Sequence, residues 1–220
     1  MKDETYITVL LDRSGSMQSV KEDTIGGFNQ FIGEQKKAGD NALLTLVQFD
    51  TGGIDVVHES KPIKEVPDLT DSTYQPRGGT PLLDALGQTI HSAGRALAAI
   101  PEMNRPDKVV FVIITDGQEN SSTEHSKADV KQLIEQQTNK YNWQFVYLGA
   151  NQDAFDEAGQ IGIASAAAAN YVGAATADAF AVASSNVGNY RKTARAQSLH
   201  FSHGQRARMM KPSGKPKLPK

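Results

Sequence analysis

Residues 6–17 read YITVLLDRSGSM, a β-rich apolar run that passes directly into a short polar loop. The run is almost uninterrupted, which is typical of a strand covered on both faces of a sheet. Residues 109–114 (VVFVII) have the same character and lead into the polar Thr115-Asp-Gly117. We therefore expect two buried strands, each followed at its carboxyl end by a loop that carries an aspartate.

Strand and helix patterns alternate along the rest of the chain. Apolar spacing predicts a helix over residues 20–37, and a second helix follows Thr80, which can cap it, with Pro81 in its first turn. Residues 42–49 and 54–59 flank a glycine-containing turn and predict an antiparallel hairpin. Further helices are predicted at 127–138, 153–159 and 177–196, and further strands at 144–148 and 161–163. The pattern predicts an α/β fold: a doubly wound, Rossmann-like, mostly parallel sheet with one antiparallel edge strand and helices on both faces.

Composition limits the class of protein. The 220 residues are 39% apolar, enough for one full core, and contain no cysteine, which excludes disulfides, thiolate metal ligands and a cysteine nucleophile. The first residues are neither a secretory signal nor a transit peptide. Polar residues interrupt the alanine-rich segment 164–183, so it is not a membrane span. We expect a soluble, cytoplasmic protein.

The net charge of -2 conceals an uneven distribution along the chain. Residues 191–220 carry 9 basic residues and no acidic one, whereas the preceding part is strongly acidic. The end of the chain also contains three prolines, and such a segment buries too little apolar surface to order itself. We expect a folded domain over residues 1–198 and a flexible basic tail over residues 199–220.

Oxygen-bearing side chains gather where predicted elements end or begin. Asp12, Ser14 and Ser16 follow the first strand, Thr80 precedes a helix, and Asp116 follows another strand. Ligands of open α/β sheets bind at the carboxyl ends of the strands. Two carboxylates and three hydroxyls are hard ligands, which suit Mg²⁺ or Mn²⁺ better than zinc. The sequence therefore predicts one divalent-metal site from these five residues.

Three motifs carry a family resemblance. In this order, DRSGSM (residues 12–17), GGT (78–80) and TDG (115–117) resemble the von Willebrand factor type A (vWA) domain with its metal-ion-dependent adhesion site (MIDAS), over roughly residues 4–196. The chain is most similar to the stand-alone bacterial or phage-encoded type. The resemblance implies that the three hydroxyls and two carboxylates hold Mg²⁺ directly or through water, and that an acidic side chain of a protein partner completes the coordination. It implies a protein-binding module of an intracellular complex, and no enzyme.

Enzymatic alternatives lack residues that their chemistry needs. A Mg²⁺-dependent phosphatase with an aspartyl nucleophile resembles D-x-D at the first loop, and here the second position is Ser14. The sequence contains no G-x-S-x-G motif of serine hydrolases and no glycine-rich nucleotide-binding motif. A phosphatase-like hydrolase is therefore the less favoured alternative.

Several residues near the motifs have simpler interpretations. Arg13 and Met17 are expected to be variable rim positions of the site. Asp50 is either a hydrogen-bond acceptor that supports the site or, as we favour, a turn residue of the hairpin. Tyr74 and Arg77 lie in the loop before Thr80, either on the binding rim or in a solvated loop.

The remaining polar residues give no second site. Asp71 and Asp84 are interpreted as surface or helix-start charges. His200 and His203 have the spacing of a helical metal pair but no nearby carboxylate, so metal binding is not expected there. The basic residues 191–220 leave open a second function, association with nucleic acid or another acidic surface.

Overall fold

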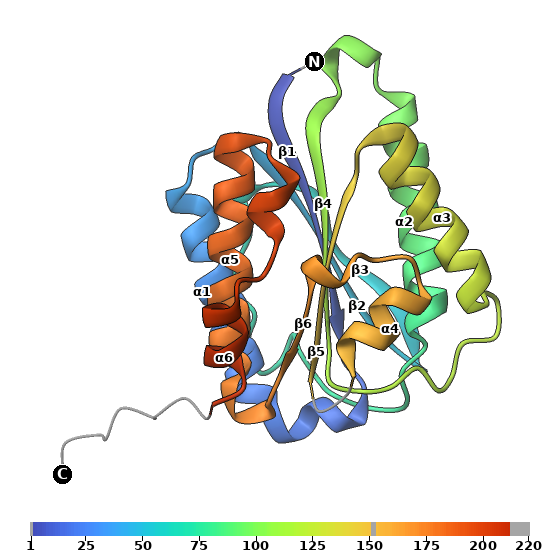
Figure 1. Ribbon diagram of the computed structural model, residues 1–220, viewed down its shortest axis with the longest axis vertical. Coiled ribbons are helices and arrows are strands. Elements are labelled where there is room, and N and C mark those ends of the chain that lie inside the picture. The colour runs from blue at the N-terminus through green and yellow to red at the C-terminus, as the bar shows by residue number, and fades with distance from the viewer. Residues whose placement is uncertain (1, 151–152, 212–220) are drawn as a thin grey trace.

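The computed structural model describes residues 2–150 and 153–211, which fold as a sheet between two layers of helices (Figure 1). The described residues form a six-stranded sheet of order β3-β2-β1-β4-β5-β6. Its strands are β1 (Lys2–Asp12), β2 (Ala42–Asp50), β3 (Gly53–Pro62), β4 (Pro106–Thr115), β5 (Gln144–Ala150) and β6 (Ala168–Tyr171). Only the β2–β3 pairing within this sheet is antiparallel, and β3 is an edge strand. The predicted fold class is confirmed.

Four longer helices and several short ones cover the two faces. The helices α1 (Lys21–Lys37), α5 (Thr176–Thr193) and α6 (His203–Met209) lie on one face, and α2 (Leu82–Ala99), α3 (Lys127–Tyr141) and α4 (Ala154–Gln160) lie on the other (Figure 1). Short 3-10 helices occupy Gly15–Val20, Ile63–Glu65, Glu102–Asn104, Ser165–Ala167, Gly173–Ala175 and Ala196–Leu199. In the described part of the chain, no helix combines the length and apolar character needed to cross a membrane.

The central strand β1 shows why its sequence is almost continuously apolar. Side chains alternate between the two faces of a strand. Ile7, Val9 and Leu11 pack into the core on the α1 and α5 side, whereas Tyr6 and Leu10 pack into the core on the α2 and α3 side. All five are at most 4% exposed. Both faces are covered, so a polar residue on either face would be buried.

The predicted strand at residues 161–163 is wrong. Gly162 has a φ of +86° and turns the chain after α4, so that Ile161 and Ile163 pack into the core from a turn. The sixth strand is instead Ala168–Tyr171, which pairs in parallel with β5. Its alanines have little intrinsic preference for strands, and pairing with the exposed edge of β5 decides their conformation.

The packed structure extends beyond residue 198, although the basic composition predicts a flexible tail from residue 199 onward. Phe201 is 4% and Met209 0% exposed, and the Val172 amide donates to the Met209 carbonyl at 3.0 Å. Ser202 caps α6 through a capping box with Gln205. Two apolar side chains therefore anchor a segment whose overall composition is basic. The rest of the predicted tail, residues 212–220, lies outside the described residues.

Candidate metal centre

The sheet order brings the predicted site together. Asp12 is the last residue of β1 and Asp116 directly follows β4, and these two parallel strands are neighbours. Ser14 Oγ lies 3.0 Å from Ser16 Oγ, and Ser16 Oγ donates to Asp116 Oδ1 at 2.5 Å. The first loop is thereby joined to the loop after β4. Strand order changes direction at this point, where ligands of such sheets are expected.

Thr80 completes the cluster from a third segment. A Cβ added to Gly117 would lie 2.7 Å from Thr80 Oγ1, 3.3 Å from Ser16 Oγ and 3.6 Å from Asp12 Oδ2. These three oxygens therefore lie together on the side of Gly117 where a side chain would project. The structure thus brings all five predicted residues together, three hydroxyls and two carboxylates from three loops.

The Asp12 carboxylate is held firmly inside the protein. Asp12 is 0% exposed, its Oδ1 accepts the Ser14 amide at 2.7 Å, and its Oδ2 accepts Thr115 Oγ1 at 2.6 Å. The Tyr74 hydroxyl donates to the Asp12 carbonyl at 2.6 Å. Both the side chain and the backbone of Asp12 are therefore fixed in direction.

The electrostatics of the cluster suit a cation. Burial raises the pKa of Asp12 to about 6, although hydrogen bonds from Thr115 and Ser14 oppose the shift, and burial also raises the pKa of Asp116. Within the described residues, neither carboxylate forms an ion pair with a lysine, arginine or histidine. Partly or fully buried carboxylates without a counter-charge, next to three hydroxyls, are a donor set that fits a hard divalent ion.

Backbone hydrogen bonds hold the loop before Thr80 against the first loop. The Gly15 amide donates to the Gly78 carbonyl at 2.9 Å, and the Arg77 amide donates to the Arg13 carbonyl at 2.8 Å. These bonds join segments more than sixty residues apart in sequence. They explain how a long, irregular loop delivers Thr80 to a fixed place.

Arg13 is a buried anchor, and the prediction that it is a rim residue is wrong. It is 8% exposed, and its Nε donates to Asp50 Oδ2 at 2.6 Å while Nη2 donates to Asp55 Oδ2 at 2.7 Å. Arg77 Nε also donates to Asp50 Oδ2, at 3.1 Å. Asp50 accepts the Gly52 amide, which confirms its predicted place in the hairpin turn. One buried carboxylate therefore ties both arginine-bearing loops to the hairpin.

Met17 and Tyr74 are also buried, contrary to their predicted rim positions. Both are 0% exposed and belong to the core on the α1 side. Asp71 is an exposed charge paired with Lys21 at 2.6 Å, as predicted for a surface residue. Asp84 lies in the first turn of α2 as predicted, but it is buried, at 6% exposure.

Thr80 does not cap α2, contrary to the sequence prediction. The helix begins at Leu82, its N-cap is Pro81, and no side chain of the N-cap residue forms a capping bond. The first-turn amides are bonded instead by Glu119 and Ser122, from the loop after Asp116. Neither residue is among the predicted functional residues, although the run ENSST at residues 119–123 is rich in side chains that bond backbone amides.

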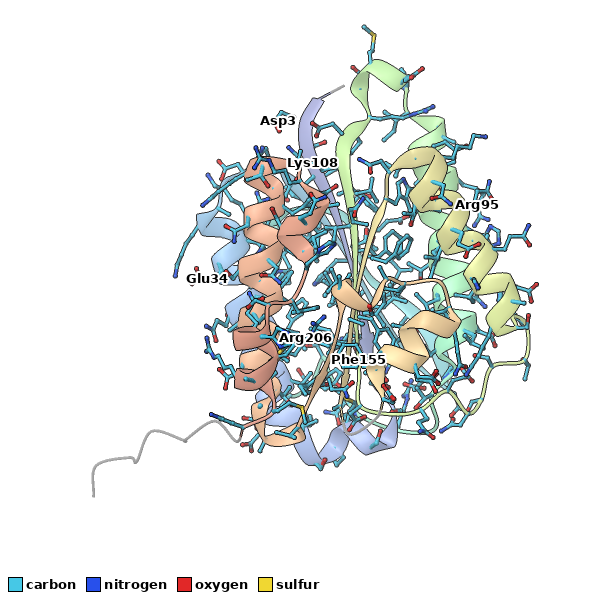
Figure 2. The ribbon with its side chains drawn as sticks, viewed as in Figure 1. Asp3, Glu34, Arg95, Lys108, Phe155 and Arg206 are labelled. Atoms are coloured by element: carbon cyan, nitrogen blue, oxygen red, sulfur yellow. The ribbon has the colours of Figure 1, made fainter. Side chains whose placement is uncertain are left out.

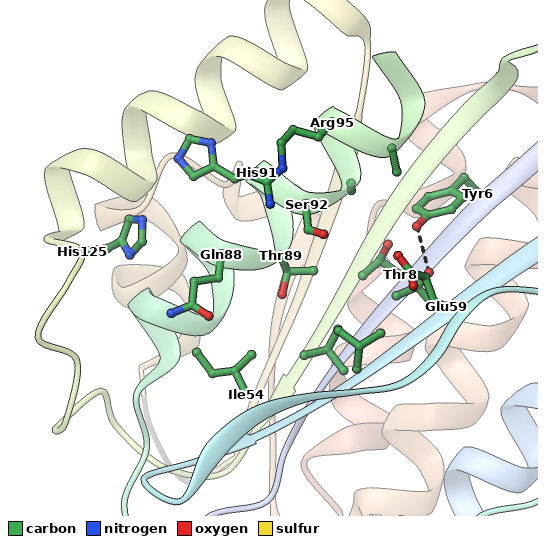
Figure 3. A pocket seen from close by; sticks show the side chains of 15 residues that line it. Tyr6, Thr8, Ile54, Glu59, Gln88, Thr89, His91, Ser92, Arg95 and His125 are labelled. Carbon is green, nitrogen blue, oxygen red and sulfur yellow. Dashed lines mark hydrogen bonds between the residues drawn. The ribbon is translucent and has the colours of Figure 1, made fainter. Parts of the chain in front are cut away.

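The histidines and the cavities lie apart from the cluster. In the described residues, no group of three or more His, Asp or Glu side chains could hold a metal, and His200 and His203 are exposed. A cavity of about 540 Å³ lies between α2 and the β2–β3 flank of the sheet, with Thr8 and Glu59 on one side and Arg95 on the other (Figure 3). None of the five predicted residues lines it. The cluster, on loops at the strand ends, is thus separate from this cavity.

Comparisons with known proteins bear on the fold. No family model and no curated protein sequence matches the chain. Proximal thread matrix protein 1 from the mussel byssus, in a structure with a zinc-occupied MIDAS motif, is similar with a TM-score of 0.59 and 15% identity, over 83% of this chain and 47% of that one. A von Willebrand factor type A structure from Catenulispora acidiphila is similar with a TM-score of 0.52 and 20% identity, over 89% and 43%.

The chain spans less than half the length of each of these proteins. At such identities the likeness concerns the fold, and the fold agrees with the strand order, the antiparallel edge strand and the two helical layers described above. We conclude that the chain has the fold of a von Willebrand factor type A domain.

Proposed function

We propose that the chain is a metal-dependent protein-binding module. Its Mg²⁺ would be held by Asp12, Ser14, Ser16, Thr80 and Asp116, and would capture an acidic side chain of a partner protein. The observation that carries the proposal is the convergence of these five side chains: Asp12, Ser16 and Thr80 lie beside Gly117, and Ser16 contacts both Ser14 and Asp116. Mn²⁺ prefers the same donor set and would substitute for Mg²⁺.

The number and type of ligands explain why such a site would bind a partner. Two carboxylates only neutralise a divalent cation, and hydroxyls donate weakly, so the ion keeps an affinity for one more anionic oxygen. Aspartate or glutamate of another protein can supply that oxygen. The position of the cluster on loops at the end of the sheet supports contact with a second macromolecule.

The donor set favours Mg²⁺ over zinc, even though the mussel protein was solved with zinc in its MIDAS motif. The cluster contains neither histidine nor, in this cysteine-free chain, any thiolate. Zinc prefers those ligands, whereas carboxylates and hydroxyls suit Mg²⁺.

We propose that the chain is not an enzyme. Phosphatases with an aspartyl nucleophile need an acid two residues after it. Here that position is Ser14, whose hydroxyl lies 3.0 Å from Ser16 Oγ. We expect no hydrolysis of p-nitrophenyl phosphate or ATP with Mg²⁺. A turnover that is lost in Asp12→Asn would show that the chain is a hydrolase.

Three basic residues near the end of the chain are bonded to other parts of the fold. Arg191 is 4% exposed and donates to the Gln35 carbonyl at 2.6 Å. Arg206 donates to the Ser165 carbonyl at 2.8 Å and lies over the Phe155 ring, 5.1 Å from its centroid (Figure 2). Arg208 pairs with Asp178. These three cations are engaged within the fold, whereas Lys192, Arg195 and Lys211 are exposed. We therefore favour the metal cluster as the binding surface, for which we propose a partner in a cytoplasmic complex, and keep the basic segment as the second candidate.

Titration with Mn²⁺, followed by electron paramagnetic resonance, tests metal binding directly. Wild-type protein should bind one ion and Asp12→Ala none, while Asp71→Ala, which removes an exposed carboxylate outside the cluster, should bind as wild type does. Far-ultraviolet circular dichroism confirms that each variant is folded. Equal binding by wild type and Asp12→Ala would refute the proposed site.

Affinity capture from the cells that make the protein tests partner binding. Wild-type protein with Mg²⁺ should retain partners that are lost with a chelator and with Asp12→Ala. High salt separates the alternative, because binding through a basic segment weakens steeply with salt and survives chelation. Recovery of the same proteins in every condition would exclude the metal cluster as the recognition surface.

A further inference from the structure

The first turn of α2 is capped by a distant loop. The first amides of an α-helix have no partner within the helix, and the N-cap Pro81 supplies none. The Leu83 amide donates to Glu119 Oε2 at 2.9 Å, and the Asp84 amide donates to Ser122 Oγ at 3.0 Å. Both acceptors belong to the loop that follows Asp116. The start of α2 therefore depends on that loop.

The loop in turn depends on the start of α2. Asp84 Oδ2 accepts the Thr123 amide at 2.7 Å, and Asp84 Oδ1 accepts the amides of Glu124 at 2.9 Å and His125 at 2.7 Å. Burial tends to raise the pKa of Asp84, but these amide bonds outweigh it and the pKa is lowered. The ionised Asp84 carboxylate thus stabilises the loop, and the two segments cap each other.

Glu119 shapes the loop internally as well. Its Oε1 accepts the amides of Ser121 and Ser122, each at 2.8 Å, and its Oε2 accepts Ser122 Oγ at 2.7 Å as well as the Leu83 amide. A single carboxylate therefore folds the turn and attaches it to α2. Each of the two Glu119 oxygens accepts two hydrogen bonds.

Thr80 lies between these two attachments. Its amide donates to Asn120 Oδ1 at 2.9 Å, and its carbonyl accepts the Asn120 amide at 3.2 Å. A Cβ on the neighbouring Gly79 would lie 2.9 Å from Asn120 Oδ1, so the backbone and the loop are in close contact. Because distant side chains cap α2, the Thr80 hydroxyl is not needed as a cap and faces Gly117.

The far end of the loop is packed against the same helix. His125 Nδ1 lies 3.4 Å from Asp84 Oδ1, and a Cβ on Gly87 would collide with the His125 ring. Figure 3 shows His125 beside the start of α2, with Gln88 and His91 of that helix nearby. This packing covers Asp84 and limits its access to water.

We propose that Asp84 and Glu119 are positioning residues of the metal centre, which hold Thr80 and Asp116 at a fixed separation before the ion binds. This inference rests on the proposed function, since it assumes that the cluster binds a metal. When the loops are already ordered in the metal-free protein, metal binding does not have to offset the entropy lost in ordering them. Loss of groups that orient metal ligands typically lowers metal affinity about 10–100-fold.

Mn²⁺ titration of Asp84→Asn and Glu119→Gln tests the proposal. Each substitution replaces one carboxylate oxygen by an NH₂ group, which cannot accept hydrogen bonds from backbone amides. We expect at least about 10-fold weaker Mn²⁺ binding. Ser126→Ala is the matched control. Ser126 caps α3 at the end of the same loop through a capping box with Asp129, but this cap does not join the loop to α2. The control should lose stability and keep wild-type Mn²⁺ affinity.

Amide hydrogen exchange of the metal-free proteins gives a second measurement. Residues 119–125 should exchange faster in Asp84→Asn than in wild type and Ser126→Ala. If Asp84→Asn does not fold, Ser122→Ala keeps both carboxylates and removes only the two bonds of the Ser122 hydroxyl, from the Asp84 amide and to Glu119 Oε2. It should weaken Mn²⁺ binding about fivefold.

The outcomes separate this inference from the proposed function. Failure of the wild-type protein to bind Mn²⁺ would refute the proposed function itself. If Asp84→Asn and Glu119→Gln bind Mn²⁺ as tightly as wild type and Ser126→Ala do, the positioning role is overturned and the proposed function stands.

Discussion

Arg13→Met tests whether Arg13 is a buried anchor of the site loops. The Asp50 side chain is 0% exposed and accepts guanidinium bonds from Arg13 at 2.6 Å and Arg77 at 3.1 Å. Removing one partner of a buried ion pair strands the other charge and costs about 3–5 kcal/mol. Because Arg77 remains, we expect the lower end of that range. A rim arginine with no such partner would change the free energy of unfolding by less than about 0.5 kcal/mol.

Urea unfolding measures the loss of unfolding free energy. In thermal unfolding, the melting temperature should fall by about 6–12 °C. The control is Asp50→Asn in the Arg13→Met background, which removes the stranded charge and should recover part of the stability. A loss below about 1 kcal/mol, within the range of an exposed ion pair, would refute the reasoning. So would a double variant no more stable than Arg13→Met.

Three further predictions follow from the same structure. Because folding lowers the pKa of Asp84, the ionised carboxylate should stabilise the fold fully at neutral pH, and this stabilisation should disappear as the pH falls below about 4. Urea unfolding of wild type and Asp84→Asn over pH 3–7 measures the difference in stability, and a difference that does not change with pH would contradict the prediction. Met209→Ala should lower the free energy of unfolding by about 2–4 kcal/mol because Met209 is 0% exposed, whereas a residue in a flexible tail would have no effect. Mg²⁺ at about 100 times its dissociation constant should raise the free energy of unfolding by about 2.7 kcal/mol, as seen in thermal unfolding with and without chelator, and Asp116→Ala should abolish that gain.

Local sequence determined the strands that carry the site. The runs that became β1 and β4 are apolar on both faces because both faces are covered, and this pattern is visible without knowledge of the partners. The hairpin of β2 and β3 follows from a short turn, which needs only neighbouring residues. Asp12, Ser14 and Ser16 lie within one loop, so their spacing alone predicts their proximity.

Tertiary structure decided the features that depend on distant segments. β6 is a strand of small residues because β5 offers an unpaired edge, and α6 is ordered because Met209 finds a place in the core. Arg13 is buried because Asp50, on another strand, supplies its counter-charge. Local patterns contain no information about such partners.

The placement of Thr80 depends most strongly on the whole fold. Its sequence context, threonine followed by proline at a helix start, predicts a cap. In the structure, Glu119 and Ser122 cap the helix from more than thirty residues away. The backbone amides of α2 are thereby satisfied, and the Thr80 hydroxyl is left facing the other oxygens of the cluster. The first amides of α2 bond to Glu119 and Ser122 because the sheet brings the loop after β4 beside the helix. The direction of the Thr80 side chain therefore depends on this tertiary contact and not on the local sequence.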